Sequence, residues 1–302
     1  MPATSNARVP GYPASRQSLG AAGLRNLGLG LLLLTVVYTV RASNAAEEVA
    51  FPSGNKTLHG LIYKPAGSGP FPTVLYNHGS APGLLNNEAF ARIAPVFTMH
   101  GWAFFAPYRR GQGLSRDAGA YIGTEIAAAS ARGGMALAAQ TAVTLLTTEQ
   151  LQDQMAALAW LRRQPFVRQG QIAVMGNSFG GIETVLGAAH VGYCAAVDAS
   201  GGAESWSAES QLRDVMLRAV RESAIPIFFF QARNDYNLAP SRVLYGAARR
   251  AGRPAQMRIY PPYGGTAAAG HSFAWRGEKV WASDVLRFVD RNCLQRHVAA
   301  AK

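Results

Sequence analysis

The sequence has 302 residues, 49% hydrophobic and 15% charged, without internal repeats or long low-complexity tracts, which suits one globular domain with a full core. Its formal net charge of +12 raises the question of nucleic-acid binding. The arginines are scattered as single residues and short pairs rather than clustered beside stacking aromatic residues, so we expect a basic solvated surface and no nucleic-acid partner.

The N-terminus has the pattern of a secretory signal peptide. Arginines precede an apolar run from Leu27 to Val40, no acidic residue occurs before Glu47, and small residues follow at 42–46. Ser43 and Ala45 fit the small-x-small rule, so we predict a signal peptide over residues 1–45 and cleavage after Ala45.

An uncleaved membrane anchor over residues 27–40 is the alternative. Fourteen apolar residues in a helix reach only about 21 Å, which is short of a hydrocarbon core of ~30 Å. We therefore expect an exported protein, periplasmic or secreted, with a mature domain over residues 46–302 and no stable membrane insertion after cleavage.

The rest of the chain alternates predicted strands with predicted helices. The expected strands are Val49–Phe51, Leu58–Tyr63, Thr73–Asn77, Trp102–Tyr108, Ile172–Met175, Cys194–Asp198, Ile227–Gln231 and Met257–Tyr260. The expected helices are Ala89–His100, Gln150–Gln164, Ile182–Ala189, Ser241–Ala251 and Glu278–Leu294. Apart from an N-terminal antiparallel hairpin, this alternation predicts an α/β fold, a mainly parallel sheet with helices on both faces. Ligands in such sheets bind at the carboxyl ends of the strands.

One segment interrupts this rhythm. Residues 117–148, after the fourth predicted strand, are rich in Ala, Gly and Thr. Inserts of this length are usually lids or disordered loops, and we predict a small lid.

The strongest chemical signal is the motif Gly176-Asn177-Ser178-Phe179-Gly180-Gly181. The pattern G-x-S-x-G alone is weak, but here it stands directly between a predicted strand and a predicted helix. That is the context of a nucleophile elbow, in which a tight turn lifts the serine hydroxyl above the sheet. We therefore predict that Ser178 is a nucleophile rather than a buried serine in a glycine-rich turn.

A serine nucleophile needs a general base, and the sequence contains six histidines. His271 alone lies in a predicted loop between the last strand and the last helix, on the same rim of the sheet as Ser178. We therefore predict His271 as the base.

The base needs an acidic partner. Asp235 follows the strand Ile227–Gln231 and gives the chain order Ser, Asp, His that accompanies such an elbow. Asp198, at the end of the preceding strand, is the competing candidate. Asp153 and Asp214 are interpreted as solvated helix positions.

Two backbone N–H groups are expected to form an oxyanion hole. One belongs to Phe179, directly after the nucleophile, and the other to the loop His78-Gly79-Ser80-Ala81 after the third strand. Ser80 is the preferred donor of that loop, Gly79 and Ala81 are alternatives, and His78 is expected to shape the loop without a catalytic role.

These motifs, together with Tyr63-Lys64-Pro65, Tyr76-Asn77-His78-Gly79 and the run Pro107 to Ser115, resemble the α/β-hydrolases over nearly all of residues 47–295. More narrowly, the chain resembles the dienelactone-hydrolase-like branch, with serine peptidases of the prolyl-oligopeptidase type close by. Two departures stand out. Members of the dienelactone branch have a cysteine nucleophile where this chain has Ser178, and prolyl oligopeptidases carry a propeller domain for which this chain is too short.

The predicted activity is acyl transfer by a serine hydrolase, first of all on small soluble carboxylic esters. A serine exopeptidase or amidase acting on short peptides is the second interpretation, and a non-catalytic binding protein on a hydrolase scaffold is the third. The resemblance implies that the arginine of the motif R-G-x-G-x-S, which is Arg110 in this sequence, braces the active-site loops. A carboxylate-binding arginine at 109 or 110 remains open.

No cofactor and no metal are expected. The spacings His190–Cys194 and Cys293–His297 correspond to one helical turn, but two such coincidences are weak support for zinc. In an oxidising compartment Cys194 and Cys293 are expected to form a disulfide, and in the cytosol they would be two buried thiols.

Overall fold

The computed structural model describes residues 45–80 and 88–295. Residues 1–44 of the predicted signal peptide, Ala81 and His297 lie outside these ranges. The strands are β1 (Glu47–Ser53), β2 (Lys56–Tyr63), β3 (Phe71–Asn77), β4 (Ala103–Pro107), β5 (Val167–Asn177), β6 (Ala195–Ala199), β7 (Ile227–Ala232) and β8 (Ala255–Tyr260). The helices are α1 (Glu88–Thr98), α2 (Ile122–Thr147), α3 (Glu149–Leu161), α4 (Phe179–Gly187), α5 (Ser210–Glu222), α6 (Ala239–Arg250), α7 (Ala267–His271), α8 (Phe273–Arg276) and α9 (Glu278–Val289).

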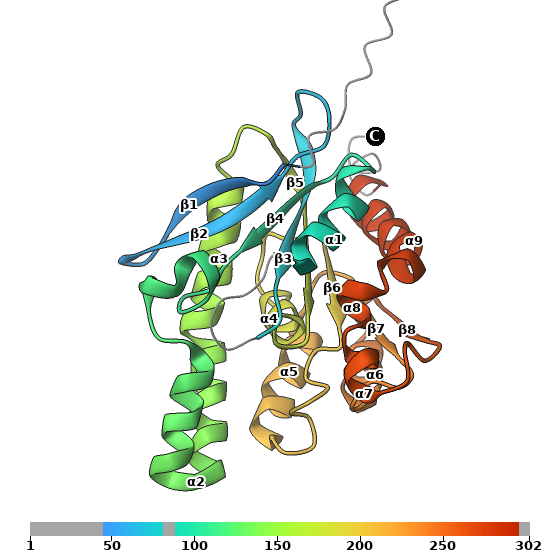
Figure 1. Cartoon of the computed structure of the whole chain (residues 1–302). Coiled ribbons are helices and arrows are strands. Elements are labelled where there is room, and N and C mark those ends of the chain that lie inside the picture. The colour runs from blue at the N-terminus through green and yellow to red at the C-terminus, as the bar shows by residue number, and fades with distance from the viewer. Residues whose placement is uncertain (1–44, 81–87, 296–302) are drawn as a thin grey trace, which may run out of the picture. The chain divides into compact units, whose positions relative to one another are not determined.

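The eight strands form one sheet in the order β1-β2-β4-β3-β5-β6-β7-β8 (Figure 1). β1 pairs with β2 and β2 pairs with β4 in antiparallel fashion, and all other pairs are parallel. The predicted hairpin and the predicted mainly parallel sheet are both confirmed. Because β3, β5, β6 and β7 are parallel neighbours, the loops after them lie at one edge of the sheet.

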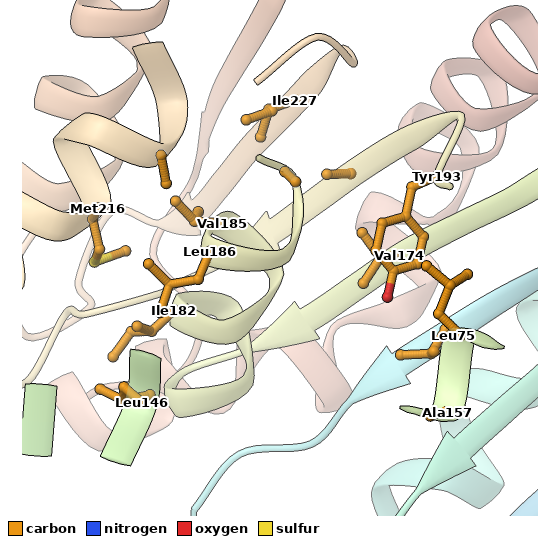
Figure 2. Close-up of a cluster of buried hydrophobic side chains, with 14 of the residues drawn as sticks. Leu75, Leu146, Ala157, Val174, Ile182, Val185, Leu186, Tyr193, Met216 and Ile227 are labelled. Atoms are coloured by element: carbon orange, nitrogen blue, oxygen red, sulfur yellow. The ribbon is translucent and has the colours of Figure 1, made fainter. Parts of the chain in front are cut away.

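Successive side chains of the central strands enter two separate cores, as the period of two in a strand requires. In β7, Ile227 and Phe229 face one core, and Phe228 and Phe230 face the other. The first core is covered by α3, α4, α5 and α6, and the second by α1, α8 and α9. Figure 2 shows part of the first core, with Ile182 of α4 near Met216 of α5.

The insert forms helices rather than an irregular loop. A short 3₁₀ helix over Gly113–Ala118 leads to α2, which is interrupted at Gly133 and Gly134 by non-helical backbone. Gly134 has φ of 71°, a conformation that glycine adopts without steric cost. Figure 1 draws α2 as two arms that meet in a turn, so the insert is a helical hairpin. Its function as a lid stays a prediction.

The two cysteines form the predicted disulfide. Cys194 lies directly before β6, and Cys293 lies in a π-helical turn, Asp290–Leu294, that follows α9. The bond thus fastens the C-terminal helix to the amino end of the sheet.

Candidate active site

Ser178 occupies a sharp turn between β5 and α4. Its backbone has φ of 54° and ψ of −120°, which is rare for a residue with a side chain. A Cβ atom at Gly176 would overlap the backbone of Gly180, and one at Gly180 would overlap the backbone of Asn77. The two glycines of the motif therefore allow the close approach that this turn needs, as expected of a nucleophile elbow.

The structure brings Ser178, His271 and Asp235 together. His271 Nε2 lies 2.9 Å from Ser178 Oγ, and His271 Nδ1 lies 2.8 Å from Asp235 Oδ1. The prediction of a loop at His271 is wrong in detail, because His271 is the last residue of the short helix α7. The contact is nevertheless made, since α7 stands between β8 and α9 at the carboxyl edge of the sheet.

The environment keeps Asp235 ionised. Burial alone would raise the pKa of this carboxyl group, but the hydrogen bond and charge of His271, together with donors Ser200 and Gln231, hold it below its ordinary value. Gln231 Nε2 donates to Oδ2 at 2.9 Å, and the backbone N–H of Tyr236 donates to Oδ1 at 2.7 Å. The carboxylate is therefore fixed in position as well as in charge.

Asp235 in turn makes His271 more basic. Burial would lower the pKa of His271, but the hydrogen bond and charge of Asp235, and to a smaller degree Glu204, raise it above the ordinary 6.5. The Tyr236 ring lies beside the imidazole in a tilted arrangement, with 5.2 Å between the ring centroids. The arrangement suits an imidazole that accepts a proton from the serine hydroxyl.

Asp198, the competing acid, does not contact His271 in the structure. It is fully buried at the end of β6, where Oδ1 accepts a hydrogen bond of 2.9 Å from the backbone of Gly201. Burial, as the largest cause, raises the pKa of Asp198 to about 7. This carboxyl group holds the turn after β6 rather than the histidine.

Ser200 is a site residue that the sequence did not reveal. It has φ of 62°, lies buried two residues after Asp198, and its side chain hydrogen-bonds to Asp235. A serine after a strand carries no pattern that distinguishes it from other turn serines, so only the fold shows this contact.

Arg109 clamps the loop after β3 to the elbow helix. Its Nη1 donates to the His78 carbonyl at 2.7 Å and to Glu183 Oε2 of α4 at 2.6 Å, and Nη2 donates to the Gly79 carbonyl at 3.1 Å. Burial, together with the charge of Arg109, lowers the pKa of His78 well below its usual range, so this imidazole is neutral. Arg109 therefore has the geometry of a brace, and His78 is buried within the braced loop.

Arg110, the arginine for which the resemblance implies the brace, has no hydrogen bond to the described residues of the loop after β3 and instead binds Asp153 of α3. Its Nε and Nη2 donate to Asp153 at 2.9 and 2.7 Å, and Ser53 Oγ donates to the same carboxylate at 2.7 Å. Asp153 is buried, so the interpretation of this residue as solvated is wrong. Helical periodicity could not predict this burial, because the partners of Asp153 lie on distant parts of the chain.

A pocket of about 180 Å³ opens beside Ser178. Ser80 and Phe179, which carry the expected oxyanion donors, line it together with Ser178. One wall is apolar and comes from the insert, α4 and α5: Ile126, Ala142, Leu146, Ile182 and Leu212. Ser80 Oγ also lies 2.6 Å from the hydroxyl of Tyr121, which directly precedes α2. The helical hairpin is therefore part of the pocket.

Within residues 45–80 and 88–295, no three His, Cys, Asp or Glu side chains are grouped to hold a metal ion. In the same part of the chain, no helix combines the length and apolar character needed to span a membrane.

Residues 58–293 match the family model of the dienelactone hydrolase family. Among solved structures, an esterase of Pyrococcus furiosus is similar with a TM-score of 0.60 and 17% identity, over 83% of this chain and 92% of that one. An acylaminoacyl peptidase of Pyrococcus horikoshii has a TM-score of 0.59 and 17% identity over 82% of this chain. The present chain spans only 42% of that peptidase, and at these identities the likeness concerns the fold alone. A search of curated protein sequences found no match.

Proposed function

The chain belongs to the dienelactone hydrolase family, and from this membership and the geometry at Ser178 we propose that it is a serine hydrolase acting on small carboxylic esters. The observation that carries the proposal is the continuous relay from Ser178 through His271 to Asp235. A non-catalytic scaffold would not need all three groups within hydrogen-bonding distance.

In the proposed mechanism, His271 Nε2 takes the proton of Ser178 Oγ as this oxygen attacks the substrate carbonyl. The N–H groups of Phe179 and Ser80 stabilise the oxyanion that forms, and the positive end of α4 adds to this effect. His271 then gives its proton to the departing alcohol, which leaves an acyl group on Ser178.

A water molecule completes the cycle. His271 takes a proton from the water as its oxygen attacks the acyl carbonyl, and then returns that proton to Ser178 Oγ. Asp235 keeps the proton of His271 on Nδ1 throughout, so that Nε2 is free to act as the base.

The pocket supports a short acyl group. Its volume is small, and the hairpin is rich in Ala and Gly as a whole, although Ile126 and Leu146 of the hairpin line the pocket. p-Nitrophenyl acetate and butyrate should therefore have higher specificity constants than p-nitrophenyl esters with acyl chains beyond about ten carbons. The specificity constant for an ester should also exceed that for the matched aminoacyl-p-nitroanilide.

The assay uses a series of p-nitrophenyl esters of rising length beside the anilides. A higher specificity constant on the anilides would favour the exopeptidase or amidase interpretation. A preference for long acyl chains would contradict the small pocket.

The activity should also depend on pH in a defined direction. His271 acts as a base only without its proton, and Asp235 raises the pKa of this group above 6.5. The kcat/KM for p-nitrophenyl butyrate should therefore rise with pH through an apparent pKa above 6.5. A profile that is flat between pH 5 and 8 would exclude His271 as the titrating base.

We further propose that the protein is exported. The disulfide between Cys194 and Cys293 supports an oxidising compartment. N-terminal sequencing of exported material should give Ala46 as the first residue, whereas Met1 on membrane-bound protein would support the anchor.

A further inference from the structure

Two carboxylates belong to the pocket beside Ser178. Glu204 and Glu209 lie in the segment between β6 and α5 and line the pocket, and no lysine or arginine is among the described residues that line it. The other lining side chains are apolar or carry hydroxyl groups. The pocket is thus locally negative in a chain with a formal net charge of +12.

Among the residues that the structure describes, no charged side chain pairs with the carboxylate of Glu209. Burial raises the pKa of this carboxyl group, and no nearby charge of the described chain offsets the effect. Arg213, one helical turn further on, is placed to pair with it. Its guanidinium instead donates to the backbone carbonyls of Trp206 and Ser207. Burial disfavours the charged form of this carboxyl group, and a bound cation beside it would favour that form.

Glu204 places the other carboxylate close to His271 and Ser178. Its Oε2 lies 3.8 Å from His271 Nε2, the nitrogen that also contacts Ser178 Oγ. The side chain of Glu204 is 60% exposed, so it stands at the open side of the pocket. A positive group of a bound ester would therefore meet one carboxylate at the reacting centre and a second one within the pocket.

We propose that Glu204 and Glu209 select esters that carry an ammonium group close to the scissile carbonyl. This inference rests on the proposed esterase function and names its substrate class. The basic surface does not oppose it strongly, since charges more than about 8–10 Å away are largely screened at physiological ionic strength. Anionic esters would be repelled by the same two carboxylates.

The test compares esters that differ in charge but not in shape. Butyrylcholine and its neutral isostere 3,3-dimethylbutyl butyrate place the cation on the alcohol side. The p-nitrophenyl esters of 4-(trimethylammonio)butyrate and 5,5-dimethylhexanoate place it on the acyl side. In at least one pair, the kcat/KM of the cationic ester should be about tenfold higher than that of its neutral isostere, as a partly exposed ion pair allows. This ratio of the two kcat/KM values should fall in high salt.

The variants Glu204→Gln and Glu209→Gln should each reduce this ratio several-fold. Glu222→Gln is the matched control, because it removes one negative charge from the exposed far end of α5 and should preserve the ratio. A wild-type ratio near one in both pairs would overturn the inference, as would equal ratios in all three variants.

Failure of the proposed function is distinguishable from failure of the inference. If the wild-type protein hydrolyses none of the four esters, the esterase proposal fails, and calorimetry of the Ser178→Ala protein still measures binding of each pair. Tighter binding of the cationic member of a pair would support the inference if this preference disappears when Ser178→Ala is combined with Glu204→Gln or with Glu209→Gln. Equal binding of both members would overturn it.

Discussion

Replacing Ser178 by alanine should lower the turnover of p-nitrophenyl butyrate by about a million-fold, as loss of the nucleophile does in serine hydrolases with such a relay. The variant lacks the oxygen that forms the acyl bond, and His271 Nε2 loses the partner at 2.9 Å. Binding of the ester should persist, because the pocket walls are unchanged. Steady-state kinetics of the variant would measure the loss, with small known amounts of wild-type enzyme added to calibrate the lowest detectable turnover.

Ser207→Ala is a suitable control for this change. Ser207 is an exposed serine between β6 and α5 whose hydroxyl accepts a hydrogen bond from Asn237. Its variant should keep most of the wild-type turnover, and both variants should show the thermal unfolding of a folded protein. A folded Ser178→Ala protein with normal turnover would refute the assignment of the nucleophile.

Replacing Asp235 by asparagine should lower turnover by about ten thousand-fold. The amide keeps the shape of the carboxyl group but can donate a hydrogen bond to Nδ1, which favours the tautomer with the proton on Nε2. His271 then cannot accept the proton of Ser178, and the charge that raises its pKa is lost. The apparent pKa of the remaining activity should accordingly fall.

Asp198→Asn provides the matched control for that change. Asp198 ends the neighbouring strand and is equally buried, but its Oδ1 accepts from Gly201 and it has no contact with His271. An asparagine oxygen can accept the same hydrogen bond, so most of the turnover should remain. If Asp198→Asn were the more damaging of the two changes, the acid would be wrongly assigned while the fold would stand.

The sheet could be predicted because its signals are local. Each central strand is a short apolar run such as Ile227–Gln231, flanked by turn residues and followed by a helix with its own periodicity. The tight turn at Ser178 could be found for the same reason, since the strand, the glycines and the helix are adjacent in the sequence. The expectation that His271 and Asp235 lie close to Ser178 followed from their order along the chain and their place after strands.

Other features depend on contacts between distant segments. The bounds of helix α5 were not predicted, although Asp214 was interpreted as a helix position. The buried face of α5 at Leu212 and Met216 packs against α4 in the first core. The roles of Ser200 and Asp153 likewise depend on partners that only the folded sheet brings near. Short-range patterns carry no information on such pairs.

The pocket was the least predictable part. It is formed by the insert, the elbow and the segment between β6 and α5, which are separated along the chain. The helical hairpin of α2 was missed because its many alanines and glycines mark no apolar stripe, while the break at Gly133 and Gly134 resembles a loop. Glu204 and Glu209 therefore became visible as pocket residues only in the structure.

Reaction with a fluorophosphonate, followed by peptide mass spectrometry, tests the central claim most directly. This reagent forms a covalent bond with a serine only where a neighbouring base and an oxyanion site activate the hydroxyl. We expect one phosphonyl adduct per chain, on the peptide that contains Ser178, and none in the Ser178→Ala protein. An unmodified native protein, or an adduct on a different serine, would contradict the claim that Ser178 is the activated nucleophile.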